Sequence, residues 1–253
     1  ILKLTEEDYS QNGMAELLIL EGNYYDLNIK MFNRLQNTIT GWPGGKPKAD
    51  DSNRPERALP MKKRCIIFSP HPDDDVISMG GTFDRLVAQG HEVHVAYQTS
   101  GNIAVSDEEA LKYIEVVSDI SEDPSVCDDL KKELLNKDKN TIDSVALRKL
   151  KGAIRKRESL AATRYIGIPD TQVHFLNLPF YESGKVKKNL PSKNDMNITS
   201  QLIKKVKPHQ IYAAGDLADP HGTHRICLDI LFDSINQLKS ESFMKDSWVW
   251  LYR

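Results

Sequence analysis

Two short clusters of polar residues in this 253-residue sequence have the composition of a catalytic metal site. The first, residues 69–75, reads Ser-Pro-His-Pro-Asp-Asp-Asp and directly follows a short apolar run. Its three consecutive carboxylates, Asp73, Asp74 and Asp75, repel one another unless a cation or hydrogen-bond donors compensate. His71 adds a nitrogen ligand of the kind that zinc favours. A solvated turn, in which proline and aspartate have ordinary turn roles, is the alternative interpretation.

The second cluster, residues 216–224, reads Asp-Leu-Ala-Asp-Pro-His-Gly-Thr-His. Asp219 is a typical helix N-cap and Pro220 a typical first helical residue. This start places His221 and His224 three residues apart on one face of the first helical turn. A capped helix with two exposed histidines is the alternative. Taken together, the two clusters offer two imidazoles and several carboxylates to one metal ion.

Zinc held by three protein ligands, with water completing the coordination, is the catalytic arrangement of this metal. It lowers the pKa of water to about 7 and polarises a carbonyl oxygen. A carboxylate that is not a ligand can then act as general base, and a second histidine can stabilise the oxyanion that forms during attack on an amide. The two clusters therefore predict hydrolysis of an amide or an ester.

Short apolar runs and helical patterns alternate from about residue 61 onward. Strands are predicted at 65–68, 93–97, 173–176, 210–214 and 248–252, and helices at 80–89, 198–206 and 226–238. Gly80 and Gly81 would open the first of these helices and Gly90 would close it. The alternation predicts an α/β fold, a Rossmann-like three-layer domain with a mostly parallel sheet. Both polar clusters directly follow a predicted strand, where open α/β sheets bind their ligands.

Residues 1–60 are predicted to form a helical extension followed by a Pro- and Gly-rich linker, and residues 61–253 the main domain. The charged stretch 106–164 is predicted to hold helical segments. Its part 119–151 is predicted to be a solvated helical excursion, with a lid or an interface as the alternative. The chain begins at Ile1 without a methionine. We interpret it as a piece of a longer protein.

Composition excludes several classes of protein. The net charge of −2 gives no electrostatic footprint for nucleic acid, and no run approaches the roughly 18 apolar residues of a membrane span. The three cysteines are too scattered for a disulfide scaffold or a metal knuckle. A reducing compartment suits them, and no signal peptide is recognisable at the N-terminus, so the cytoplasm is the expected location.

The order of these motifs resembles that of the PIG-L/LmbE-like N-deacetylases, which use zinc to remove the acetyl group from N-acetylglucosaminyl substrates. The resemblance runs from about residue 63 to residue 238. The motifs that carry it are Pro70-His71-Pro72-Asp73-Asp74, Gly80-Gly81, Thr99-Ser100-Gly101, Arg155 with Glu158, and the pair His221 and His224.

This resemblance implies roles for five residues. His71, Asp74 and His224 would be the ligands of zinc, or of another divalent metal. Asp73 would be the general base that activates water. His221 would stabilise the tetrahedral oxyanion and assist the departure of the amine.

Three further residues receive supporting roles from the resemblance. Arg155 would contact the substrate, with an ion pair to Glu158 on the helix surface as the alternative. Asp75, where the family usually has glutamate, and Asp219 would support the ligands without binding the metal themselves.

The N-terminal extension with Thr40-Gly41-Trp42-Pro43-Gly44-Gly45, together with residues 69–105, also resembles the C-terminal half of bacterial fusion proteins. In those proteins a glucosamine-6-phosphate deaminase-like domain precedes a PIG-L-like domain. The implied substrate is an N-acetylated amino sugar, with or without a phosphate, because deacetylation makes the free amine that a deaminase would consume. The family includes homo-oligomers.

Two other functions remain open at this point. One is a catalytically quiet domain that binds sugar or organises the fused deaminase. The other is deaminase chemistry in this chain itself, although loss of an amine through sugar ring opening needs no metal ligands.

Overall fold

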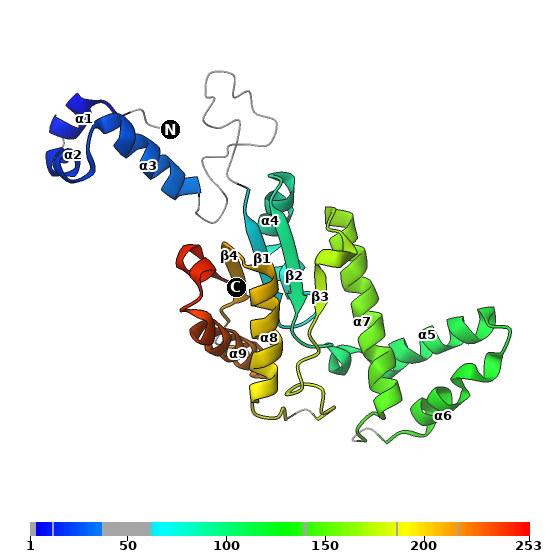
Figure 1. Cartoon of the computed structure of the whole chain (residues 1–253). Coiled ribbons are helices and arrows are strands. Elements are labelled where there is room, and N and C mark those ends of the chain that lie inside the picture. The colour runs from blue at the N-terminus through cyan, green and yellow to red at the C-terminus, as the bar shows by residue number, and fades with distance from the viewer. Residues whose placement is uncertain (1–3, 12, 37–61, 139–140, 186, 217) are drawn as a thin grey trace.

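The computed structural model describes residues 4–11, 13–36, 62–138, 141–185, 187–216 and 218–253. A five-stranded parallel sheet in the order β3-β2-β1-β4-β5 forms its centre, with helices on both faces (Figure 1). The strands are β1 (Arg64–Ser69), β2 (Glu92–Tyr97), β3 (Val173–Phe175), β4 (Gln210–Ala214) and β5 (Trp248–Tyr252). The main helices are α4 (Asp74–Ala88), α5 (Asp107–Ile120), α6 (Asp128–Asn136), α7 (Val145–Ile166), α8 (Lys193–Val206) and α9 (Thr223–Leu238). Short 3-10 helices span Asn102–Ala104, Pro124–Cys127, Asp170–Gln172 and Ser242–Asp246. The predicted α/β fold and its five strands are confirmed.

β1 is buried on both faces, which explains its uninterrupted apolar sequence. Cys65 and Ile67 pack with side chains of α4 and α7 in one core. Ile66 and Phe68 pack with α8 and α9 in a second core. Successive side chains of a strand point to opposite faces, so this single strand contributes to both cores and fixes the three-layer arrangement.

The strand order reverses between β1 and β4. The chain passes from β1 to β2 on one side of the sheet and later from β4 to β5 on the other, so the connections that follow these two neighbouring strands lead in opposite directions. Phe68, near the carboxyl end of β1, lies in register with Ala213 near the end of β4. Ligands of open α/β sheets bind at such a switch point, and the two predicted polar clusters follow these two strands.

The start of α4 differs from its prediction. The helix begins at Asp74 rather than Gly80, so its first turn belongs to the first polar cluster. Met79 has non-helical backbone angles, φ −139° and ψ 19°. This break divides α4, and Gly80 begins only its second part.

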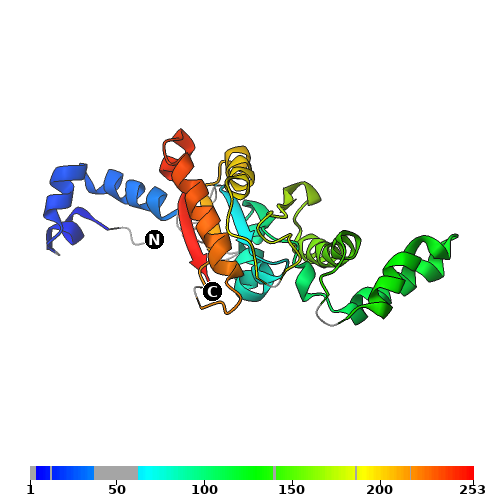
Figure 2. The same cartoon turned by 90° about the horizontal axis from the view of Figure 1, so that it is seen from below.

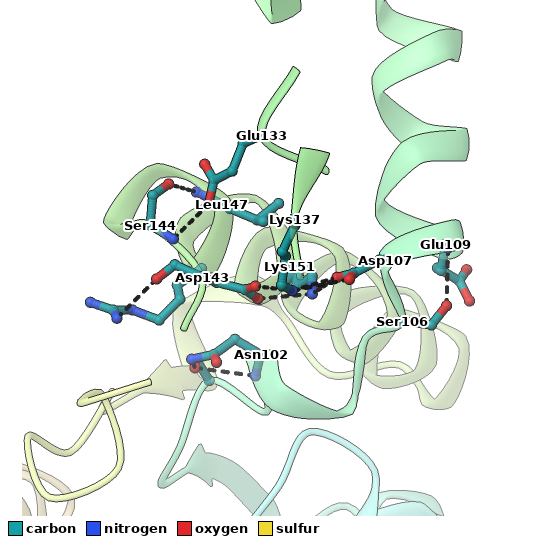
Figure 3. Close-up of polar contacts among 12 residues, drawn as sticks. Asn102, Ser106, Asp107, Glu109, Glu133, Lys137, Asp143, Ser144, Leu147 and Lys151 are labelled. Carbon is teal, nitrogen blue, oxygen red and sulfur yellow. Dashed lines mark hydrogen bonds and ion pairs between the residues drawn. The ribbon is translucent and has the colours of Figure 1, made fainter. Parts of the chain in front are cut away.

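The charged stretch 106–164 folds into α5, α6 and most of α7, as its prediction of helical segments requires. The α5–α6 hairpin projects away from the sheet in both views (Figure 1, Figure 2). Ion pairs among two lysines and two aspartates connect the hairpin to α7 (Figure 3). Lys151 of α7, which is 4% exposed, lies 2.6 Å from Asp107 and 2.8 Å from Asp143, and Lys137 pairs with the same two carboxylates.

Lys151→Met is expected to lower the free energy of unfolding by about 2 kcal/mol, because it takes one of two lysine partners from the partly buried carboxylate of Asp143. Urea unfolding followed by far-UV circular dichroism measures the change. Lys112→Met is the matched control, since Lys112 pairs with Glu109 on the exposed surface of α5 and such pairs contribute at most about 1 kcal/mol. Equal stability of the two variants would contradict an anchoring role for the buried lysine.

The N-terminal extension contains α1 (Glu6–Gln11), α2 (Ala15–Glu21) and α3 (Tyr24–Gln36), as its helical prediction requires. Tyr9 is buried and donates a hydrogen bond to Asn28 across this unit. The predicted linker and the domain boundary at residue 61 lie outside the described residues. None of the described helices combines the length and apolar character that crossing a bilayer requires.

Candidate active site

His71, Asp74 and His224 each bring one ligand atom to a common point beyond the switch between β1 and β4. His71 Nδ1 lies 3.2 Å from His224 Nε2 and 3.3 Å from Asp74 Oδ2. His224 Nε2 lies 3.4 Å from the same carboxylate oxygen. The three atoms thus form a nearly equilateral triangle, and all three side chains are half-buried.

This triangle fits a tetrahedral metal ion. Zinc binds nitrogen and oxygen at about 2.0–2.2 Å, so two of its tetrahedral ligands lie roughly 3.4 Å apart. Two histidines with one carboxylate are also a donor set of catalytic zinc sites. The pKa of His224 is raised, because its hydrogen bond to Asp74 outweighs the effect of burial. A positive charge is therefore favoured where the three ligand atoms meet.

Hydrogen bonds from neighbouring segments fix the loop that carries His71. Thr99, just after β2, donates both its backbone N–H and its hydroxyl to the carbonyl of Pro70. Ser159 of α7 donates to the carbonyl of Pro72 at 3.2 Å. The loop is therefore held on both sides of the histidine, by the adjacent strand and by the helix that packs on the sheet.

The three consecutive aspartates turn to three different partners. Asp73 Oδ2 lies 2.7 Å from a guanidinium nitrogen of Arg155. Asp74 faces the two histidines, and Asp75 is fully buried. Because α4 begins at Asp74, the positive end of the helix dipole also favours this run of negative charge.

The two inner carboxyls have opposite pKa shifts. Burial would raise the pKa of Asp74, but interactions with His224 and His71 hold it well below its usual value. Burial raises the pKa of Asp75 to about 6, against a hydrogen bond from Tyr97. The Tyr97 hydroxyl donates to Asp75 at 2.9 Å. The lowered pKa of Asp74 keeps it negatively charged and able to bind a cation, whereas Asp75 is buried and hydrogen-bonded to Tyr97.

Arg155 forms one of its two predicted contacts and one that was not predicted. It forms the ion pair with Glu158 at 3.2 Å and also holds Asp73. Gly101, with φ +64°, makes room for this arrangement, because a Cβ there would lie 2.7 Å from Cδ of Pro72 and 3.4 Å from Nε of Arg155. Contact of this arginine with substrate stays a prediction.

The second polar cluster folds differently from its prediction. Asp219 is not the N-cap of α9, because the chain turns at Gly222, with φ +72°, and the helix begins at Thr223. Its buried carboxylate still accepts the backbone N–H groups of His221 and His224, at 3.0 and 2.9 Å. These bonds lower the pKa of Asp219 although burial opposes them. Asp219 thereby orients the start of α9, while His221 lies before the helix with an exposed side chain.

Two residues near the site were missed by sequence reasoning. The Tyr181 ring meets the His71 ring edge-on, with 5.9 Å between centroids. Glu182 accepts hydrogen bonds from the backbone and hydroxyl of Ser100, at 3.1 and 3.0 Å, and from Asn102 at 3.2 Å. Both follow β3 in the chain, and the rule that sites gather beyond the carboxyl ends of strands could have indicated this loop.

Comparison with known proteins shows the family to which the chain belongs. Residues 66–235 match the PIG-L family, described as GlcNAc-PI de-N-acetylase. A glucosamine-6-phosphate deaminase-like protein of Bacteroides thetaiotaomicron is 53% identical over 264 aligned positions, which include the whole of this chain and 40% of that protein. The chain therefore spans less than half the length of this relative.

Solved structures resemble the chain at lower identity. The N,N'-diacetylchitobiose deacetylase of Pyrococcus horikoshii has a TM-score of 0.50 and 18% identity, and the match covers 88% of this chain and 68% of that one. GalB, the 4-carboxy-2-hydroxymuconate hydratase of Pseudomonas putida, has a TM-score of 0.45 and 17% identity, over 72% of this chain and 59% of that one. At this level of identity, the similarity to the deacetylase shows that the two proteins share a fold.

Proposed function

Because this chain belongs to the PIG-L family, we propose that it is a metal-dependent hydrolase that removes the acetyl group from an N-acetylated amino sugar. The observation that carries this proposal is the triangle of ligand atoms from His71, Asp74 and His224, with edges of 3.2 to 3.4 Å. It lies at the point where this fold binds ligands. The carboxylate next in sequence, Asp73, belongs to the same loop.

His71, Asp74 and His224 would hold the ion, zinc or another divalent metal. When bound, such an ion polarises the amide carbonyl and makes water more acidic. Asp74 supplies the negative charge of the donor set, and the two imidazoles bind as neutral ligands.

Asp73 is proposed as the general base. Its carboxylate accepts one proton as the water oxygen bonds to the carbonyl carbon. The carbon–nitrogen bond then breaks, the amine nitrogen takes a proton from protonated His221, and acetate and the free amine leave. His221 also stabilises the negative carbonyl oxygen before the bond breaks. Acetic acid loses its proton to solvent as acetate leaves, and the proton held by Asp73 returns through solvent to His221, so both residues regain their starting states.

Arg155 is proposed to orient this base. Its contact with Asp73 would keep the carboxylate in one direction, whereas its second contact, with Glu158, lies at the partly exposed surface of α7. A bound sugar hydroxyl could share the remaining guanidinium hydrogens. The arginine thus links α7 to the catalytic loop.

The name of the Bacteroides relative suggests the place of this reaction in a longer protein. A deacetylase that releases an amino sugar would supply the amine that a deaminase-like partner domain consumes. We propose this pairing for the full-length protein, with deacetylation as the first of the two steps.

Acetate release from N-acetylglucosamine and its phosphates tests the proposal. Metal-loaded protein should release one acetate for each free amine formed, and prior treatment with a chelator should stop both. Absence of acetate with every N-acetylhexosamine offered would favour a catalytically quiet sugar-binding domain. Release of ammonia from glucosamine 6-phosphate would indicate deaminase chemistry in this chain.

A further inference from the structure

A pocket of about 390 Å³ adjoins the catalytic loop. Its volume lies within the range of about 300–1,000 Å³ that small-molecule sites occupy. Pro72, which stands between the proposed ligand His71 and the proposed base Asp73, forms part of its wall. α7 lines one side and the segments after β2 and β3 line the other. The pocket and the proposed metal site thus share this loop, although His71, Asp74 and His224 do not line the pocket.

Three cations of α7 line this pocket: Arg148, Lys149 and Lys156. Arg148 donates to the backbone carbonyls of Asp143 and Ser183, at 3.2 and 3.3 Å. The Lys156 ammonium lies 4.8 Å from the centroid of the Phe175 ring. Within the part of the chain that the structure describes, none of the three forms an ion pair with a carboxylate.

Other cations of the same helix do have carboxylate partners. Lys151, Arg155 and Arg164 pair with aspartates or glutamate elsewhere on the molecule. Every charged residue of α7 except Glu158 is positive. The three cations that line the pocket thus lack a carboxylate partner among the described residues, as does Arg157 on the exposed side of α7 outside the pocket.

The acidic residue in the pocket wall, Glu182, offsets only part of this charge, because three cations line the pocket with one carboxylate. Its two carboxylate oxygens accept hydrogen bonds from Ser100 and Asn102. A carboxylate fixed in this way is suited to accept a sugar hydroxyl. The pocket therefore offers positive charge on the α7 side and a hydrogen-bond acceptor on the opposite side.

We propose that this pocket binds a phosphate monoester carried by the amino-sugar substrate. A compact dianion gains charge-assisted hydrogen bonds from lysine and arginine together. Lys156 is held over an aromatic ring and Arg148 is tied to two carbonyls, so less side-chain freedom is lost on binding. The identity of the sugar rests on the proposed function, but the anion site rests on the pocket alone.

Binding of glucose 6-phosphate and of glucose, measured by calorimetry on the intact chain, tests the pocket without any reaction. The wild type should bind the phosphate ester at least tenfold more tightly. The double variant Lys149→Gln, Lys156→Gln should lose roughly tenfold to a hundredfold of this affinity, since each lost charged hydrogen bond costs about tenfold or more. Arg157→Gln is the matched control: it removes one charge from an exposed position of α7 outside the pocket and should keep the preference.

Acetate release provides a second arm. The ratio of kcat/KM for N-acetylglucosamine 6-phosphate or 1-phosphate to that for N-acetylglucosamine should fall in the double variant and stay constant in Arg157→Gln. Inorganic phosphate should compete with the phosphorylated sugars. Equal wild-type affinity for glucose and glucose 6-phosphate, or an unchanged preference in the double variant, would overturn the anion site. Phosphate-dependent binding without acetate release would support the pocket and count against the proposed hydrolysis.

Discussion

Asp73→Asn is expected to lower kcat/KM for acetate release by about a thousandfold, within the range that general-base catalysis contributes. Asparagine has the shape of aspartate but cannot accept the proton of the attacking water. Because Asp73 is not among the three atoms of the ligand triangle, bound metal should stay at the wild-type level. Steady-state kinetics and elemental analysis of the same preparation measure both quantities.

Glu158→Gln is the matched control for this substitution. Glu158 is the other carboxylate that pairs with Arg155, at 3.2 Å against 2.7 Å for Asp73. Both substitutions remove one negative charge from the same guanidinium, but only one removes the proposed base. The control should stay within about twofold of wild-type activity, because partly exposed ion pairs contribute little. Comparable losses in both variants would assign the effect to Arg155 rather than to proton transfer.

His224→Ala is expected to abolish metal binding at stoichiometric concentrations and, with it, acetate release. It removes one of three protein ligands, and the affinity should fall by more than the roughly 10- to 100-fold that loss of a supporting contact costs. Elemental analysis after dialysis measures the metal content, and a thermal melt shows whether the variant is folded. An active His224→Ala variant with a full complement of metal would contradict the ligand assignment.

His221→Ala provides the contrast, three residues away and with the same change of side chain. His221 precedes α9 and is exposed, whereas His224 faces Asp74 and His71. The His221 variant should keep its metal and lose about a hundredfold in kcat, the cost of removing one stabiliser of the oxyanion. Loss of metal from the His221 variant would show that His221 is also needed for metal binding, which contradicts its proposed role as a stabiliser of the oxyanion alone.

The strands were predictable because a strand that is buried on both faces has an uninterrupted run of apolar residues. Ile66 and Ile67 face opposite helical layers, so no polar residue interrupts the run between them. The same reasoning located β4 and placed both polar clusters beyond the carboxyl ends of central strands. The fold class therefore follows from apolar patterning, and the position of the candidate site from the polar clusters that come directly after two of the strands.

The starts of α4 and α9 were less predictable, because the residues at both starts belong to the candidate site and do not form ordinary helix-start patterns. The first turn of α4 consists of acidic residues and the exposed Val76 and Ile77. It therefore lacks the inward apolar face by which a helix is recognised. At α9 the sequence Asp-Pro has the form of a helix cap, yet Asp219 reaches the helix from a preceding turn that Gly222 closes.

The partners of the catalytic loop could not be predicted, because they depend on how distant segments pack. Tyr97 reaches Asp75 from the end of β2, and Tyr181 meets His71 from the loop after β3. Arg155 was expected near the substrate, but its ion pair with Asp73 joins residues 82 positions apart in the sequence. Residue types suggested the ligands, whereas only the fold shows that three adjacent aspartates point to three separate partners.

Titration of metal-free protein with zinc, while acetate release from an N-acetylated amino sugar is recorded, tests the central claim most directly. The account predicts that the rate rises with added zinc and reaches a plateau at one ion per chain. His224→Ala should show no such rise over the same range. A rate that is already complete in the metal-free protein, or a plateau unrelated to one ion per chain, would contradict the proposed metal site.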